Sequence, residues 1–182
     1  MKKVLLCVLL MLLSTAVTYA EIIRKKVVSA DGTTELIFYS GTQEVARQRI
    51  GDNGRVIKTT GKVPDGVVRA YHSNGVLVGE MSYEHGKLEG IERTYYKNGN
   101  LRSETTYKNG KREGVIKKFY GGGTVSAESH YKNDTLEGIT THYYRTGVVS
   151  DIYTYKNGQL VNRKTYDEKG ILRLERDFPK EK

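Results

Sequence analysis

Residues 66–161 contain the feature that most constrains the fold, because they are four copies of one 24-residue pattern that align without a gap. With the opening glycine of each copy called position 1, position 6 is aromatic, position 10 is glycine, position 12 is aliphatic and position 18 is tyrosine. A fixed period of this size is typical of a stacked repeat array, in which each unit contacts its neighbours. The chain is therefore expected to be elongated. The four units begin at Gly66, Gly90, Gly114 and Gly138.

Each unit is expected to be a β-hairpin. Glycine at position 10 follows asparagine in Asn74-Gly75 and Asn98-Gly99, and Asn-Gly is the strongest short signal for a two-residue type I′ turn. The flanking residues are rich in Val, Ile, Thr and Tyr, which suit strands. A second turn signal links one hairpin to the next, at His85-Gly86, Asn109-Gly110 and Asn157-Gly158.

A two-residue turn at positions 9 and 10 predicts that position 8 faces 11, position 7 faces 12 and position 4 faces 15. The charges favour the last pairing, since position 4 is basic and position 15 is Glu in three units, whereas the fourth has Thr141 and Ile152. Opposite charges across a strand pair contribute roughly 0.2–1 kcal/mol. We interpret them as solvated ion pairs rather than as catalytic carboxylates. The predicted pairs are Arg69–Glu80, Arg93–Glu104 and Lys117–Glu128.

The hairpins are expected to stack edge to edge. An isolated two-stranded hairpin is only marginally stable in water, so each unit needs its neighbours to cover it. The predicted fold class is all-β, with tandem β-hairpin repeats of period 24 that form one elongated, twisted antiparallel sheet.

Residues 1–20 have the composition of a secretory signal peptide. Two lysines at positions 2 and 3 precede an apolar run over residues 4–13, which is too short to span a bilayer as a helix. Small residues offer cleavage after Ala16 or after Ala20. We therefore expect an exported protein that is periplasmic, envelope-associated or secreted.

The processed chain would contain no cysteine, because Cys7 is the only one in the sequence. It would then have neither a disulfide nor a thiol nucleophile. Removing Lys2 and Lys3 lowers the net charge of +9 by two charges. The remaining positive charge is spread over turns and strands rather than gathered in one block.

The regular array is flanked by less regular sequence. Residues 21–65 are expected to form degenerate hairpins around Asp31-Gly32 and Asn53-Gly54, as an N-terminal cap on the same sheet or, alternatively, as a separate small β-domain. Residues 66–182 are assigned to the repeat array, with four full units and a truncated fifth. Pro179 and the charged tail after it are expected to protect the last strand from pairing with another chain.

The stretch Tyr107–Gly114, Tyr-Lys-Asn-Gly-Lys-Arg-Glu-Gly, resembles the signature of the MORN repeat variant family, often labelled YwqK-type antitoxin in bacteria. The resemblance covers residues 66–178 well and residues 21–65 loosely. It implies an all-β repeat sheet that binds other molecules, as an antitoxin or immunity partner, as a scaffold or in contact with lipid. It brings no catalytic residues. A cytosolic antitoxin needs no signal peptide, so an antitoxin role would require a toxin that acts in the envelope.

We find no motif for catalysis, and we expect no enzyme activity, no cofactor and no metal. The run Gly121–Gly123 lacks the Lys-Ser/Thr of a phosphate-binding loop and stands where other units have a hairpin turn. No serine lies in a Gly-x-Ser-x-Gly elbow. The histidines occupy different repeat positions without the cysteines or spaced acids of a metal site; they are His72, His85, His130 and His142.

Two repeated rows are candidate binding surfaces. Position 7 is aromatic or histidine, and the predicted register places it on the same face as positions 12 and 18 and opposite position 6. Such a row either packs within the sheet or contacts a partner. The position-7 row is His72, Tyr96, Tyr120 and Tyr144. The second row is basic and lies at the turns, as Lys97 and Arg145 near the first turn and Lys108, Lys111, Lys132 and Lys156 near the second.

The leading hypothesis is an exported, non-enzymatic repeat protein that binds a partner protein through its Tyr-lined sheet, as an antitoxin or immunity protein does. The alternative is a peripheral envelope protein whose basic turns bind anionic lipid or cell-wall polymer. Nucleic acid is not expected as a partner, because export would separate the protein from it.

Overall fold

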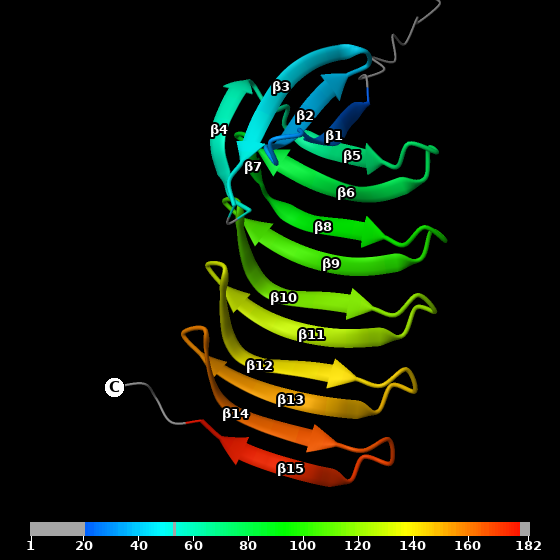
Figure 1. The fold of residues 1–182 in the computed structure, drawn as a ribbon, viewed down its shortest axis with the longest axis vertical. Coiled ribbons are helices and arrows are strands. Elements are labelled where there is room, and N and C mark those ends of the chain that lie inside the picture. The colour runs from blue at the N-terminus through cyan, green and yellow to red at the C-terminus, as the bar shows by residue number, and fades with distance from the viewer. Residues whose placement is uncertain (1–20, 53, 179–182) are drawn as a thin grey trace, which may run out of the picture.

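The computed structural model describes residues 21–52 and 54–178, and in this part of the chain fifteen strands form one open sheet. The strands of the repeats follow one another down a single layer (Figure 1). The predicted all-β repeat fold is therefore confirmed. The sheet is mixed, however, because β1 (Ile22–Val28) pairs in parallel with β5 (Gly66–Tyr71). In the described residues we find no helix that is long and apolar enough to cross a membrane.

The N-terminal segment and the repeats contribute strands to this same sheet. Besides β1, the N-terminal segment contains β2 (Thr34–Ser40), β3 (Gln43–Ile50) and β4 (Val56–Gly61). Besides β5, the repeats contain β6 (Leu77–Glu84), β7 (Lys87–Leu88), β8 (Gly90–Tyr95), β9 (Leu101–Lys108), β10 (Lys111–Phe119), β11 (Val125–Lys132), β12 (Thr135–Tyr143), β13 (Val149–Lys156), β14 (Gln159–Tyr166) and β15 (Leu172–Asp177).

Position 4 faces position 15 in every full unit, as predicted. The charged pairs are in contact, at 2.8 Å between Arg69 Nε and Glu80 Oε1 and at 3.2 Å between Lys117 Nζ and Glu128 Oε1. In the fourth unit Thr141 faces Ile152. These pairs define one face of the sheet, which we call the outer face.

The first turn of each unit differs from the prediction. In the first unit, Gly75 N donates to His72 O at 2.9 Å and His72 N donates to Val76 O at 2.8 Å. Among these residues only Gly75 has a positive φ, of 82°, so a type I turn is followed by a left-handed glycine. Position 6 therefore faces position 12, as in the pair Tyr71–Leu77. The predicted pairings of position 8 with 11 and of position 7 with 12 were wrong, because a longer loop uses the same Asn-Gly signal.

The second turn is the one with type I′ geometry. Both of its central residues have positive φ, with 53° at Asn109 and 79° at Gly110. The third unit keeps this geometry without glycine, since Asn133 has φ 49° and Asp134 has φ 70°. Asn and Asp tolerate this region better than other side chains do.

The glycine at position 1 marks a bend in the strand. In β10, residues 113–115 lie opposite the single residue Thr106, between the pairs Arg112–Tyr107 and Ile116–Thr105. Gly114 adopts φ 81° in this bulge. Extra residues on one strand bend it, and β10 and β12 curve close to their second-turn ends (Figure 1).

The acidic residue just before the position-1 glycine of each unit forms a hydrogen bond between the bend and the second turn of that same unit. Its carboxylate accepts a hydrogen bond from the backbone N–H of the first turn residue, which lies 20 positions later. This satisfies a backbone donor that no strand partner reaches. The bonds are Asp65–His85 at 2.7 Å, Glu89–Asn109 at 2.7 Å, Glu113–Asn133 at 2.8 Å and Glu137–Asn157 at 2.7 Å.

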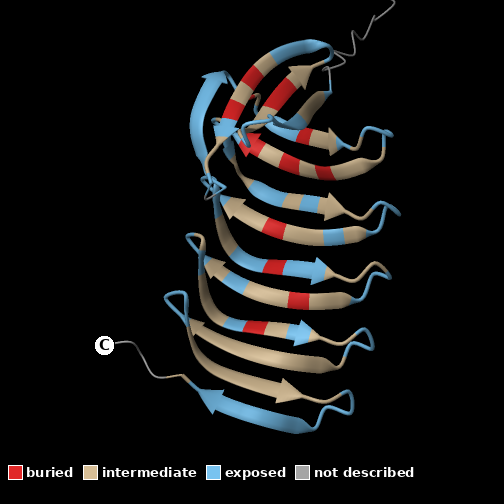
Figure 2. Cartoon of the chain, viewed as in Figure 1, coloured by how far each residue is buried: buried red, intermediate tan, exposed pale blue. Residues whose placement is uncertain are grey.

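Strands β1–β4, together with residues 62–65, form what we call the cap, and the buried core lies where it meets the first unit. Phe38 and Val68 are fully buried there, and the Phe38 ring meets the Tyr83 ring edge to face with centroids 5.3 Å apart. Figure 2 shows buried residues gathered at this end, with none in β13, β14 or β15. The core cluster is Phe38, Ala46, Val63, Val68, Met81 and Tyr83.

Candidate functional site

The face of the array that meets the cap, opposite the ion pairs, is called the inner face. It carries positions 3, 5, 14, 16 and 18, since Val68 pairs with Met81 and Ala70 pairs with Gly79. The inner face stays partly packed beyond the cap, with Ile116, Thr105 and Thr140 buried. It also presents a group of half-buried tyrosines, which are Tyr107, Tyr131, Tyr153 and Tyr155.

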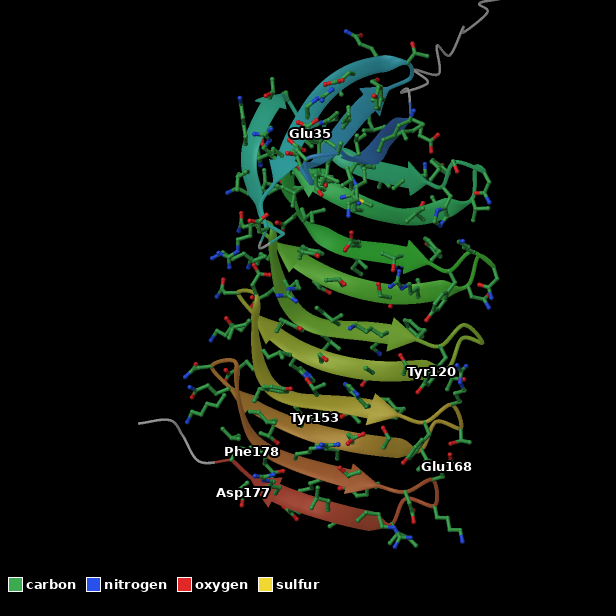
Figure 3. The ribbon with its side chains drawn as sticks, viewed as in Figure 1. Glu35, Tyr120, Tyr153, Glu168, Asp177 and Phe178 are labelled. Carbon is green, nitrogen blue, oxygen red and sulfur yellow. The ribbon has the colours of Figure 1, made fainter. Side chains whose placement is uncertain are left out.

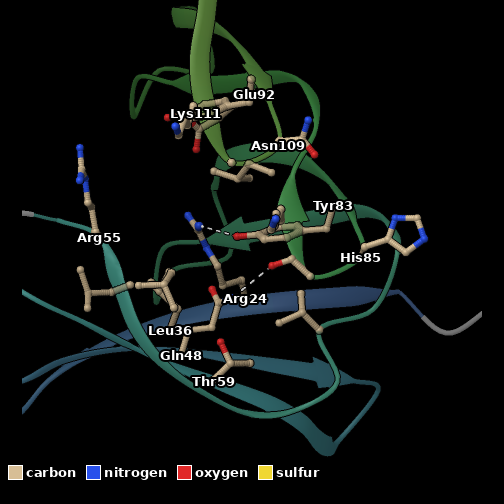
Figure 4. Close-up of a pocket in the computed structure, with 18 of the residues that line it drawn as sticks. Arg24, Leu36, Gln48, Arg55, Thr59, Tyr83, His85, Glu92, Asn109 and Lys111 are labelled. Atoms are coloured by element: carbon tan, nitrogen blue, oxygen red, sulfur yellow. Dashed lines mark hydrogen bonds between the residues drawn. The ribbon is translucent and has the colours of Figure 1, made fainter. Parts of the chain in front are cut away.

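A cleft of about 1500 Å³ opens between the cap and the array (Figure 4). Three parts of the chain form it, namely the inner face, the cap and the second turns of the first three units. Gln48 of the cap donates from Nε2 to Gly86 O at 3.4 Å, which joins the cap to the first of these turns. The central side chains are Tyr83, Glu92 and Tyr107 from the inner face, and Gln48, Val56 and Thr59 from the cap.

Positive charge predominates along the cleft. Two acidic side chains line it, Glu92 and Asp134. Asp134 is already paired, because Arg112 Nε donates to its Oδ1 at 3.0 Å while the Arg112 guanidinium lies 4.2 Å from the centre of the Tyr131 ring. The basic side chains are Arg24, Arg55, Lys62, Lys87, Lys111 and Arg112.

Burial alters the titration of the side chains inside the cleft. It raises the pKa of Glu92, against the opposing charge of Arg24 and a hydrogen bond with Tyr107. It also raises the pKa of Tyr83 and of Tyr107. Arg24 Nη1 donates to the Tyr83 hydroxyl at 3.3 Å, as Figure 4 shows. Arg24 already lies close to Glu92, so an anionic ligand is better suited to the lysines of the cleft than to a place beside the buried Glu92 carboxyl.

The position-7 residues lie just beyond their strands, where the first turn begins. Three of them donate their hydroxyls to the backbone of the next hairpin, so they connect neighbouring units. Figure 3 labels Tyr120 at this edge of the sheet, and the Arg145 guanidinium lies 4.8 Å from the centre of its ring. His72 is half-buried at the corresponding place in the first unit. The bonds are Tyr96 to Phe119 O at 2.6 Å, Tyr120 to Tyr143 O at 2.6 Å and Tyr144 to Tyr166 O at 2.8 Å.

The structure divides the predicted basic residues between the two edges of the sheet. Lys97 and Arg145 are exposed at the first-turn edge. Lys111 lines the cleft at the second-turn edge. The other three are exposed along that same edge, outside the cleft; they are Lys108, Lys132 and Lys156.

The histidines of the chain do not come together in one site. His130 Nδ1 lies 2.8 Å from Ile139 O, the His142 ring packs beside Tyr153 with centroids 5.2 Å apart, and His85 lines the cleft. Among the described residues no three metal-binding side chains converge.

Most residues of the cleft were not predicted from the sequence. Arg24 and Lys62 come from the irregular N-terminal segment, so their approach to the array depends on how the cap folds back. Glu92 carried a usable signal, because position 3 is otherwise Val68, Ile116 or Thr140. An acid in such a row of buried residues indicates a local change of environment.

The geometry defines a single-layered β-repeat protein with a cleft at its capped end. The family profile of the MORN repeat variant matches four consecutive stretches, and the chain belongs to the MORN-repeat proteins. The matched residues are 64–85, 88–109, 112–133 and 136–157. A comparison with curated proteins gave no significant match.

Proposed function

We propose that this MORN-repeat protein is exported, has no enzymatic activity and binds a partner protein along its inner face. The observation that carries the proposal is the tyrosine group Tyr107, Tyr131, Tyr153 and Tyr155, which lies on a face that the cap covers only at one end. Tyrosine is favoured at protein interfaces because it combines a large apolar ring with a polar tip. An immunity protein that binds a toxin in the envelope is one form of this function.

The position-7 row belongs to the proposal as the border of this surface. Hydrogen bonds occupy the hydroxyls of Tyr96, Tyr120 and Tyr144, so a partner would contact the exposed parts of these half-buried rings rather than the hydroxyls. His72 continues the row in the first unit. Export rests on residues 1–20, which lie outside the described residues.

A pull-down from the native envelope tests the proposal. The bait is the processed protein, compared with a double variant of the inner face, Tyr131→Ala with Tyr155→Ala. The control is Tyr95→Ala with Tyr143→Ala, since these position-6 tyrosines lie on the outer face and Tyr95 bonds Glu80 there. The inner-face variant is expected to lose the partner, and the control to retain it. Equal recovery by both variants, with circular dichroism showing intact sheets, would contradict the proposal.

The exposed lysines of the second-turn edge support an alternative. Lys108, Lys132 and Lys156 recur at position 19 along one edge, and each contributes about 1 kcal/mol of attraction near an anionic membrane. This function predicts co-sedimentation with anionic liposomes or cell walls at low salt and release at high salt. If the protein does not sediment with them, or if its sedimentation is insensitive to salt, this alternative function is contradicted.

A further inference from the structure

We propose that the cleft between the cap and the array binds an acidic, extended segment of the partner protein. This inference rests on the proposed function and names the chemistry that the partner brings to one end of the inner face.

Three lysines of the cleft lack an ion-pair partner within the described part of the chain, unlike the position-4 cations of the outer face. On the outer face the position-4 cations face carboxylates across the strand pair, as in Arg93–Glu104 at 2.8 Å. In the cleft, Lys62, Lys87 and Lys111 are exposed and form no ion pair with any residue that the structure describes. Three cations around one opening repel each other, and an anionic ligand relieves that repulsion.

The two carboxylates that line the cleft, Glu92 and Asp134, form no ion pair with these lysines. Asp134 is held by four hydrogen bonds with Arg112, each 3.0 Å long: its Oδ1 accepts two, its backbone O accepts one, and its backbone N donates one to Arg112 O. Glu92 lies deeper in the cleft, hydrogen-bonded with Tyr107 and close to Arg24. The acidic side chains inside the cleft are therefore already engaged, and an anionic group from outside can pair with the lysines.

The shape of the cleft favours a polypeptide segment over a small molecule or a bilayer. Its volume of about 1500 Å³ exceeds the ~300–1,000 Å³ of typical small-molecule pockets. It is recessed between the cap and the turns, so a flat membrane cannot approach the lysines and the floor together, whereas an extended chain can enter from the inner face. Apolar side chains beside the charges, among them Leu36, Val56 and Leu88, suit a segment in which acidic and apolar residues alternate.

Fluorescence anisotropy with model peptides tests the inference. The probe is a labelled peptide of about ten residues that alternates Glu with Tyr, and its counterpart has Gln in place of each Glu. The cleft variant is Lys87→Glu with Lys111→Glu. The matched control is Lys132→Glu with Lys156→Glu, which changes the net charge equally at second turns outside the cleft.

The Glu peptide is expected to bind at least about tenfold more weakly to the cleft variant than to the wild type, and within about twofold of wild type to the control. The Gln peptide should bind wild type at least about tenfold more weakly than the Glu peptide. Equal losses in both variants, or equal binding of both peptides, would overturn the inference. So would binding of anionic phospholipid vesicles that needs Lys87 and Lys111 while the Glu peptide fails to bind.

The native-envelope pull-down separates this inference from the proposed function. Loss of the partner from the Lys87→Glu/Lys111→Glu bait supports the inference. A partner recovered equally by the wild type and this bait would overturn the inference and leave the proposed function standing. If the wild-type bait captures no partner while the Glu peptide still discriminates between the variants, the proposed function fails and the anionic specificity of the cleft stands.

Discussion

The hydroxyl of Tyr120 reaches from one hairpin to the backbone of the next, where it donates to Tyr143 O at 2.6 Å. Replacing Tyr120 with Phe removes this donor and leaves the ring in place. We expect the free energy of unfolding to fall by about 0.5–1.5 kcal/mol, the usual net contribution of one hydrogen bond. Urea denaturation followed by circular dichroism measures the change.

Tyr155→Phe is the control for that experiment. The Tyr155 ring packs beside Tyr153, with centroids 6.4 Å apart, and its hydroxyl has no hydrogen-bond partner among the described residues. This substitution is expected to change stability by no more than about 0.5 kcal/mol. If both variants lose the same free energy of unfolding, the Tyr120 hydrogen bond does not stabilise the contact between neighbouring hairpins.

Glu92 provides a prediction about pH. Burial raises the pKa of its carboxyl in the folded protein above the ordinary value of 4.5, so the folded state binds the proton more tightly than the unfolded chain does. Its contribution to stability is complete below pH 4.5 and is lost as pH rises through the folded pKa. Glu92→Gln is therefore expected to unfold at a higher temperature than wild type at neutral pH and to show a weaker fall in stability between about pH 4 and pH 8.

Thermal melts across that pH range measure the difference for Glu92. Glu168→Gln, in an exposed turn of the last hairpin (Figure 3), should keep the wild-type profile. A Glu92→Gln profile parallel to that of wild type would contradict the assignment.

At the scale of the β-strand, the bend depends on a single backbone conformation. Gly114 has φ 81° and no atom within 4 Å of where a Cβ would be built, so Gly114→Ala adds no clash and costs only the left-handed conformation, about 1–2 kcal/mol. Gly122 also has open space but no positive φ. Gly122→Ala should be neutral or stabilise by up to about 1 kcal/mol. Urea denaturation of both variants checks this, and equal effects would mean that β10 bends for another reason.

Strand existence and the pairing of positions 4 and 15 were predictable, because both leave a periodic record of apolar and charged residues. The turn types were not, since Asn74-Gly75 and Asn109-Gly110 are the same dipeptide in different turns. The first dipeptide lies in a longer loop that ends in a left-handed glycine, whereas the second forms a two-residue type I′ turn. The pairing of the neighbouring strands determines which of the two loops forms. The cleft was less predictable still, because the parallel pairing of β1 with β5 is a non-local contact without a local sequence signal.

At the scale of the whole molecule, stability is unevenly distributed along the array. The one core cluster that the described residues form lies at the cap, and each later unit contributes few buried side chains. Beyond the cap, cohesion comes from interfaces between adjacent hairpins, which resemble one another because the same positions meet in each. Such an array behaves as a sum of units and nearest-neighbour terms, so its length should be adjustable in whole units.

Deletion of residues 114–137 removes one complete unit and joins Glu113 to Gly138, which recreates the acid-glycine step at the bend. The shortened protein is expected to fold, with a β-sheet circular dichroism spectrum and a denaturant m-value roughly one seventh lower, because m scales with the surface exposed on unfolding. Deletion of residues 114–125 removes only half a unit and reverses the direction of every later strand, so it should abolish cooperative unfolding. If the two deletions behave alike, the 24-residue unit is not the unit of stability.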